Sequence, residues 1–183
     1  MPRYQRHLDA AHQIWKKYHS ADLIVDATCG NGHDALFLAG LEPKLLYALD
    51  INPEAVKKTA ERLPPHTPVR LLCQSHAQFP AEILPESVDL IVYNLGYLPG
   101  GDKNATTLTA TTLQSLQAAC LLLKPQGLLS ITCYPGHLEG EKEKEACITW
   151  AKTLESKVWS VEFRQWINRP KSPSLLLIEK RAR

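Results

Sequence analysis

The G-x-G-x-x-G/A pattern of turns that bind nucleotide cofactors is matched by the segment Gly30-Asn31-Gly32-His33-Asp34-Ala35. Glycines in such a turn let the backbone pass close to a ligand. Asp50 lies twenty residues after Gly30, in the position of an acid that accepts hydrogen bonds from a ribose diol. The pattern predicts a cofactor that carries a ribose, and it suits NAD and S-adenosylmethionine equally.

Asp26, four residues before Gly30, separates these two cofactors. A carboxylate at this point would repel the pyrophosphate of a dinucleotide, whereas it suits a cofactor that carries an ammonium and a sulfonium and no phosphate. The segment Asp26–Gly32 also resembles the acid-x-G-x-G-x-G motif of class I methyltransferases, with Thr28 in place of the first glycine. We therefore predict S-adenosylmethionine as the cofactor. The alternative is that Asp26 only caps a turn.

A second polar segment, residues 93–103, contains three glycines and begins with Tyr93-Asn94-Leu95. Asn94 resembles the asparagine of the N-P-P-Y loop of amino-methyltransferases. Its side-chain oxygen and the Leu95 carbonyl are placed to accept hydrogen bonds from a target nitrogen and so to turn the lone pair toward a methyl group. An asparagine removes no proton, so the role predicted for it is orientation. The alternative is a turn asparagine with a conformational role only.

A third polar segment is Tyr134-Pro135-Gly136-His137. His137 or Asp34 is a candidate to accept a proton from the substrate. Tyr134 or Tyr97 is a candidate to stack on a base, and either tyrosine equally fits the wall of a cleft. The residues predicted to carry the chemistry are Asn94, Asp34, Tyr134 and His137, with Leu95 and Tyr97 as substrate contacts.

Hydrophobic periodicity indicates alternating strands and helices around these segments. Helices are expected at residues 7–18, 34–41, 52–63, 109–123 and 141–154, and strands at 23–26, 45–50, 69–73, 88–93 and 128–133, with a turn at 125–127 and an antiparallel pair at 158–166 and 175–180. Apolar strands that alternate with helices predict a Rossmann-like α/β fold, a seven-stranded and mostly parallel sheet covered on both faces. One domain over residues 1–183 is expected.

Ligands of such sheets bind beyond the carboxyl ends of the strands, where all the polar segments above are expected to lie. Ser75 and His76 follow the third strand, where this fold meets the adenine. A single histidine has a structural role more often than a binding role, so both interpretations of His76 stay open. The predicted cofactor contacts are Asp26, Gly30, Asn31, Gly32, His33, Asp50, Asn52, Ser75 and His76.

Composition excludes several other classes of protein. The five cysteines are scattered without a C-x-x-C pair, which indicates neither a disulfide framework nor a zinc site. For the same reason we expect no bound metal. No apolar run is long enough for a signal peptide or a membrane span, so we expect a cytoplasmic protein. The formal net charge of +2 neither requires nor excludes a nucleic acid.

The whole chain resembles one family. Residues 26–34, 94–103, 134–140 and 178–180 look like the YtqB/MnmM family, whose members have been described as rRNA methylases. The resemblance implies methylation of the aminomethyl group on a 2-thiouridine at the tRNA wobble position. It also implies the tRNA anticodon arm and a second copy of the chain, in a homodimer, as partners. Cys29 and Asn52 depart from the family, which has methionine and glutamine there.

An RNA substrate would be held by the protein's own basic surface, and Arg3, Arg6, Arg169 and Lys171 are predicted to contact phosphates. Three alternatives remain from the sequence. The acceptor is an rRNA base, a protein amide or a metabolite; the protein is an NAD-dependent oxidoreductase; or it binds RNA without catalysis.

Overall fold

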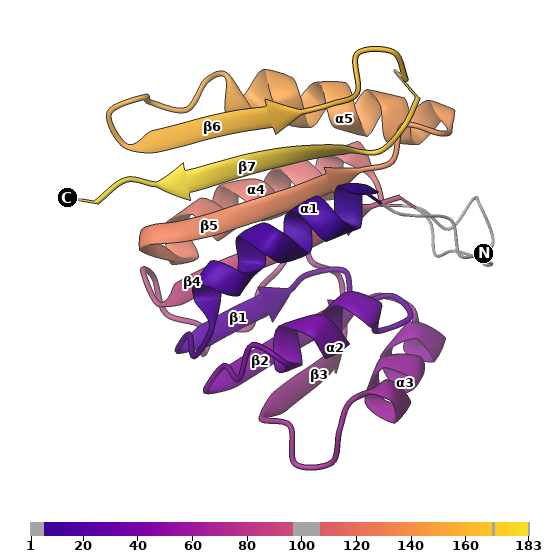
Figure 1. Ribbon diagram of the computed structural model, residues 1–183, viewed down its shortest axis with the longest axis vertical. Helices are drawn as coiled ribbons and strands as arrows, with labels where there is room; N and C mark the ends of the chain where they lie inside the picture. The colour runs from indigo at the N-terminus through magenta and orange to yellow at the C-terminus, as the bar shows by residue number, and fades with distance from the viewer. Residues whose placement is uncertain (1–5, 97–106, 170, 183) are drawn as a thin grey trace.

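Seven strands form one sheet in the order β3-β2-β1-β4-β5-β7-β6 in the computed structural model (Figure 1). The structure describes residues 6–96, 107–169 and 171–182, except for the side chains of residues 6–8. The first five strands pair in parallel, and β7 runs antiparallel to both β5 and β6. The strands are β1 Leu23–Asp26, β2 Leu45–Asp50, β3 Val69–Cys73, β4 Val88–Leu95, β5 Leu123–Cys133, β6 Trp159–Arg164 and β7 Ser174–Lys180. The predicted fold class and the antiparallel C-terminal pair are confirmed.

Helices cover both faces of this sheet (Figure 1). They are α1 Arg6–Trp15 with the short helix η1 Lys16–Tyr18, α2 His33–Ala39, α3 Pro53–Arg62, α4 Thr109–Leu122 and α5 Leu138–Ala151. The helices α1 and α2 pack on one face through Trp15 and Leu38, and α4 and α5 pack on the other through Leu116 and Cys147. This double cover explains why the central strands are apolar almost throughout.

Two helix starts are fixed by local sequence. Asn52 caps α3, since its side chain accepts a hydrogen bond from the Glu54 amide at 3.0 Å, and Pro53 occupies the first helical position. Gly32 precedes α2 with φ of +78°, and a Cβ there would lie 2.8 Å from the Thr59 Cα. Only glycine fits both the backbone angle and the space.

The turn predicted at residues 125–127 is wrong as a break between helix and strand, because β5 begins directly after α4. Pairing with β4 shifts register between Val88 and Leu90, and Gln126 takes a φ of +67° within the irregularity. The extra residues therefore form a bulge inside β5, and the sequence Pro-Gln-Gly gives the same turn signal for a bulge as for a loop.

The strand order reverses beside β1. The chain builds β2 and β3 on one side of β1 and then crosses to place β4 on the other side. The carboxyl ends of β1 and β4 therefore lie at a topological switch point, where open α/β sheets form their ligand crevices. Asp26 ends β1 and Asn94 lies near the end of β4.

Candidate active site

Asp26 is fully buried at the end of β1. The Thr28 amide donates to its Oδ1 at 3.2 Å, and its Oδ2 has no hydrogen-bond partner within the described residues. Burial raises the pKa of Asp26 well above its usual value, and the negative charges of Asp34 and Asp50 raise it further. An unpartnered buried carboxyl of this kind fits a ligand that brings a positive charge.

Asp50 organises the glycine turn. Its Oδ2 accepts from the Gly30 amide and its Oδ1 from the Asn52 amide, both at 2.9 Å. The turn is held further by Thr59, whose hydroxyl donates to the Gly30 carbonyl at 3.2 Å. A carboxylate oxygen has two lone pairs, so each oxygen of Asp50 keeps one acceptor site. The position fits the predicted ribose contact and adds a structural role that the sequence did not indicate.

Asn94, Asp34 and His12 form a chain of contacts across three elements. The Asn94 side-chain amide Nδ2 donates to Asp34 Oδ2 at 2.7 Å, and His12 Nε2 lies 2.7 Å from Asp34 Oδ1. The Asn94 backbone amide donates to the Thr28 hydroxyl at 2.7 Å. The structure thus brings together two predicted residues, Asn94 and Asp34, and adds His12 and Thr28, which the sequence reasoning missed. The sequence signal that was available for His12 was its place at the edge of the apolar stripe of α1, three residues before Trp15.

Tyr134 lies close to this cluster. Burial raises the pKa of Tyr134, and the negative charge of Asp34 raises it further. A Cβ on Gly96 would lie 3.4 Å from the Tyr134 Cβ. His137 caps α5, since its Nδ1 accepts from the Gly140 amide at 3.0 Å. The histidine therefore already uses one ring nitrogen as an acceptor, and its predicted part in proton transfer stays a prediction.

His76 and Ser75 make contacts of a structural kind. The His76 ring is buried, its Nε2 lies 3.4 Å from the Thr112 hydroxyl, and its edge faces the ring of Tyr93. Burial lowers the pKa of His76 to about 4. The Ser75 hydroxyl accepts from the Ala77 amide at 3.2 Å. These contacts favour the structural interpretation of His76, and adenine binding stays a prediction.

Glu143 of α5, which the sequence reasoning did not single out, binds Thr107 and the helix α4. The buried Glu143 accepts from the hydroxyls of Thr107 at 2.6 Å and Thr112 at 2.5 Å. Thr107 in turn bonds Gly96, because the Gly96 amide donates to its hydroxyl at 2.9 Å and the Thr107 amide donates to the Gly96 carbonyl at 3.2 Å. Gly96, two residues after Asn94, and Thr107 are thereby held together. Tyr97 and Arg3, and the side chain of Arg6, lie outside the described residues.

The connection between β6 and β7 lies at the same edge of the sheet as Asn94. Register carries Asn94 to Thr132, Leu175 and Arg164 on successive strands, a distance of about 14 Å at about 4.8 Å per strand. Two exposed apolar side chains follow, with Trp166 41% and Ile167 100% exposed. The exposed residues Arg169 and Lys171 lie in this connection too.

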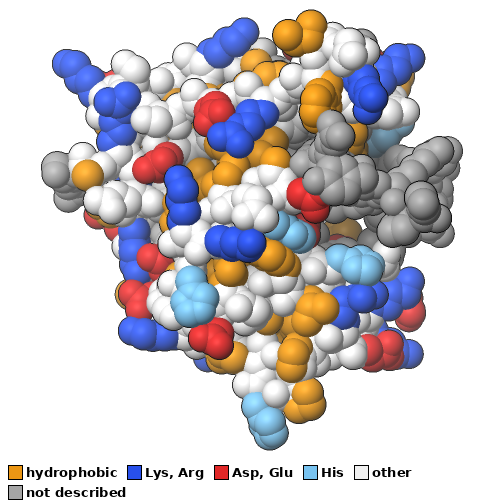
Figure 2. All heavy atoms as spheres, in the orientation of Figure 1, with side chains coloured by type: hydrophobic (Ala, Val, Ile, Leu, Met, Phe, Trp, Pro, Cys, Tyr) orange, Lys and Arg blue, Asp and Glu red, His pale blue; other side chains and the backbone are white. Residues whose placement is uncertain are grey.

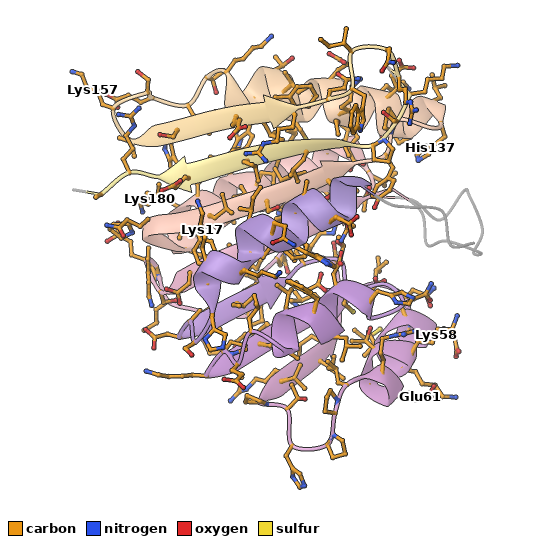
Figure 3. The ribbon with its side chains drawn as sticks, viewed as in Figure 1. Lys17, Lys58, Glu61, His137, Lys157 and Lys180 are labelled. Atoms are coloured by element: carbon orange, nitrogen blue, oxygen red, sulfur yellow. The ribbon has the colours of Figure 1, made fainter. Side chains whose placement is uncertain are left out.

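Other cations lie elsewhere. Figure 3 shows Lys17, Lys157 and Lys180 at the end of the sheet opposite to His137. On the face that carries α1, basic and acidic side chains are intermixed (Figure 2). Of the predicted RNA contacts, Arg169 and Lys171 lie in the β6–β7 connection, at the same end of the sheet as Asn94.

The described residues contain neither a membrane-spanning helix nor a cluster of metal ligands. No helix within them is long and apolar enough to cross a bilayer. Likewise, residues 6–96, 107–169 and 171–182 contain no group of three or more His, Cys, Asp or Glu placed to hold a metal ion.

Comparison with known proteins finds close relatives. Residues 46–180 match the family described as "Putative rRNA methylase". A chloroplastic tRNA (mnm(5)s(2)U34)-methyltransferase of Arabidopsis thaliana is 35% identical over 189 aligned residues, which cover 94% of this chain and 69% of the relative.

Solved structures agree over nearly the whole chain. A "putative rRNA-methylase" from Clostridium thermocellum matches with a TM-score of 0.89 and 33% identity over 95% of this chain and 97% of its own. A "putative methyltransferase" from Streptococcus mutans, solved in complex with SAH, matches with a TM-score of 0.87 and 31% identity over 96% of this chain and 98% of its own.

Proposed function

Because the chain belongs to the family described as "Putative rRNA methylase", we propose that it is an S-adenosylmethionine-dependent methyltransferase that acts on tRNA. The acceptor in this proposal is the aminomethyl group of a wobble 2-thiouridine, as the name of the Arabidopsis relative suggests. The structural observation that carries the proposal is the buried Oδ2 of Asp26 beside the glycine turn, which has no hydrogen-bond partner among the described residues.

The residues of the site fit this cofactor. Asp26 would hold its ammonium group, since its Oδ2, which has no partner within the described residues, would gain a charge-assisted hydrogen bond there. Asp50 would accept from the ribose hydroxyls with the lone pairs that the turn leaves over. A dinucleotide fits less well, because its pyrophosphate would meet Asp26 and Asp34. When bound, S-adenosylmethionine supplies a methyl group on a positively charged sulfur, which is open to attack by a nitrogen lone pair.

Asn94 is the residue that would orient the acceptor amine. The buried Asn94 Oδ1 has no partner within the described residues and accepts from an N–H of the amine. The backbone carbonyl of Leu95 is the second predicted acceptor. With two N–H bonds fixed in this way, the nitrogen lone pair points along the remaining direction, and positioning of this kind supplies much of the rate of a transfer reaction. The secondary amine formed releases its proton to solvent.

The β6–β7 connection would hold the RNA. Arg169 and Lys171 would neutralise phosphates, and Trp166, which is 41% exposed, would contact a nucleotide near the wobble base. Arg164, which ends β6 just before this connection, lies about 14 Å from Asn94 across the sheet, so the connection and Asn94 would contact the same anticodon loop.

The test uses tRNA from cells that form 5-aminomethyl-2-thiouridine and lack its methylation. The purified protein, S-adenosylmethionine and this tRNA should yield the methylaminomethyl nucleoside, measured by mass spectrometry of digested RNA. Asn94→Ala should lower kcat with little change in the affinity for tRNA. Ribosomal RNA is the parallel acceptor, and methylation of rRNA without tRNA would contradict the proposal.

A further inference from the structure

His12, on the helix α1, lies outside the glycine turn and the segment after β4, yet its ring reaches the residue that holds Asn94. We propose that His12 is a positioning residue of the transfer site, which acts through Asp34 to keep the Asn94 side-chain oxygen turned toward the acceptor amine. The inference rests on the proposed function, because it concerns how the same site aligns an amine.

The orientation of the Asn94 amide follows from the nature of its partner. An ionised carboxylate only accepts hydrogen bonds, so Asp34 selects the NH2 side of the amide, which lies 2.7 Å from its Oδ2. The oxygen must then point the other way, and it is the Asn94 Oδ1 that is buried without a partner among the described residues. A half turn of the amide would present N–H groups to an amine that itself needs to donate. Asp34 therefore decides whether the site accepts or repels the substrate nitrogen.

His12 in turn holds Asp34. Its Nε2 lies 2.7 Å from Asp34 Oδ1, and since the carboxylate only accepts, Nε2 carries the proton of this contact. The Asp34 side chain is only 10% exposed and that of His12 24%, so water competes weakly for this bond. Asp34 also lies near enough to Asp26 for its charge to act on that carboxyl. Without His12, the repulsion between the two carboxylates and the open Oδ1 would leave Asp34 free to rotate away from Asn94.

The His12 ring is itself fixed by packing. It stacks on Phe37 with centroids 3.8 Å apart and planes within 12°, and Trp15 lies 5.0 Å away. This stack raises a competing explanation, in which His12 only joins α1 to α2. The two roles use different parts of the side chain, because packing needs the ring and positioning needs the N–H.

The deciding experiment separates ring from donor. His12→Phe keeps a ring for the stack on Phe37 and removes the donor, whereas His12→Gln keeps an N–H near the place of Nε2 and removes the ring. His19→Gln is the matched control, since His19 also lies beside a carboxylate, 3.5 Å from Glu42, but is 58% exposed and outside the site. For His12→Phe we expect kcat to fall by about tenfold to hundredfold, as for a small misplacement of a reacting group, with KM for tRNA and the affinity for S-adenosylmethionine within twofold. His12→Gln should recover most of this loss.

A second readout needs neither RNA nor catalysis. In nitrogen-15 NMR, the Asn94 side-chain amide protons, assigned by their absence in Asn94→Ala, should exchange slowly with water in the wild type and in His12→Gln, and faster in His12→Phe. If the wild type methylates no tRNA, the proposed function fails and this measurement still decides the role of His12.

Further outcomes would overturn the inference. A kcat of His12→Phe equal to that of the wild type, or an equal loss in both His12 variants, would leave only the packing role. If His12→Phe does not fold, Asp34→Asn must show the same loss of kcat and the same faster amide exchange. Where His12→Phe folds, combining the two substitutions should add nothing to the larger single effect, whereas additive losses would show that His12 does not act through Asp34.

Discussion

Replacement of Asp26 by asparagine should change stability and cofactor affinity in opposite directions. Asp26 is fully buried, its Oδ2 has no partner within the described residues, and burial raises its pKa well above the usual value. Leaving a buried polar group without a partner costs about 1–3 kcal/mol, and a charged group costs more. We therefore expect Asp26→Asn to stabilise the cofactor-free protein by at least about 1 kcal/mol at pH 7, a rise in Tm of roughly 2–4 °C.

The pH dependence gives this prediction a sign. In the unfolded chain Asp26 loses its proton at about pH 3.9, whereas the folded protein keeps the proton to a higher pH because the folded pKa is raised. The unfavourable contribution is thus absent below about pH 3.9 and grows as the pH rises toward the folded pKa. The difference in Tm between Asp26→Asn and the wild type should widen over the same interval, measured by thermal unfolding in a series of buffers.

Cofactor binding should respond the other way. Loss of a charge-assisted hydrogen bond costs on the order of 1.5–3 kcal/mol, so calorimetry should show the affinity for S-adenosylmethionine reduced by roughly tenfold or more. An Asp26→Asn protein that is less stable than the wild type at pH 7 and binds the cofactor equally well would refute the assignment, because Asp26 would then be a structural cap only.

Three further predictions test the turn and the RNA surface. Gly32→Ala should lower Tm by several degrees, because a Cβ would lie 2.8 Å from a Cα of α3 at a φ of +78°, with a cost of about 1–3 kcal/mol; an unchanged Tm would contradict this. Asp50→Ala should abolish cofactor binding in calorimetry and also lower Tm, since two backbone amides lose their acceptor; unchanged affinity would remove Asp50 from the site. Arg169→Ala with Lys171→Ala should flatten the salt dependence of tRNA binding by a slope of about 2, whereas Lys17→Ala, at the opposite end of the sheet, should not.

Local sequence patterns predicted the fold class and most of its strands and helices. Apolar runs such as residues 69–73 coincide with a strand in the structure, and Asn52-Pro53 starts a helix as predicted. Positions just after the strands also predicted which polar residues meet, because parallel strands end at one edge. Asn94 and Asp34 are hydrogen bonded although sixty residues separate them.

The site residues that the sequence analysis missed or left open depend on contacts between distant elements. His12 reaches the site only because α1 packs over the sheet beside α2, and no spacing within α1 announces that partner. The sequence left His76 open between a binding and a structural role, and the structure shows its ring buried beside Thr112 of α4. Sequence position identifies the edge of a sheet, whereas the rotamer that decides between core and cleft is set by neighbours that the local pattern does not contain.

The pair of hydrogen bonds between Gly96 and Thr107 has a consequence for how this fold diversifies. Gly96 follows the end of β4 and Thr107 precedes α4, and these two residues bond to each other while Glu143 holds Thr107 from α5. An insertion closed at its own base transmits little strain to the scaffold, and the entropy of closing it changes only slowly with its length. Changing the number of residues between Gly96 and Thr107 should therefore leave this bonded pair and the sheet beside Asn94 in place, so evolution or an engineer can vary that stretch of sequence without rebuilding the fold.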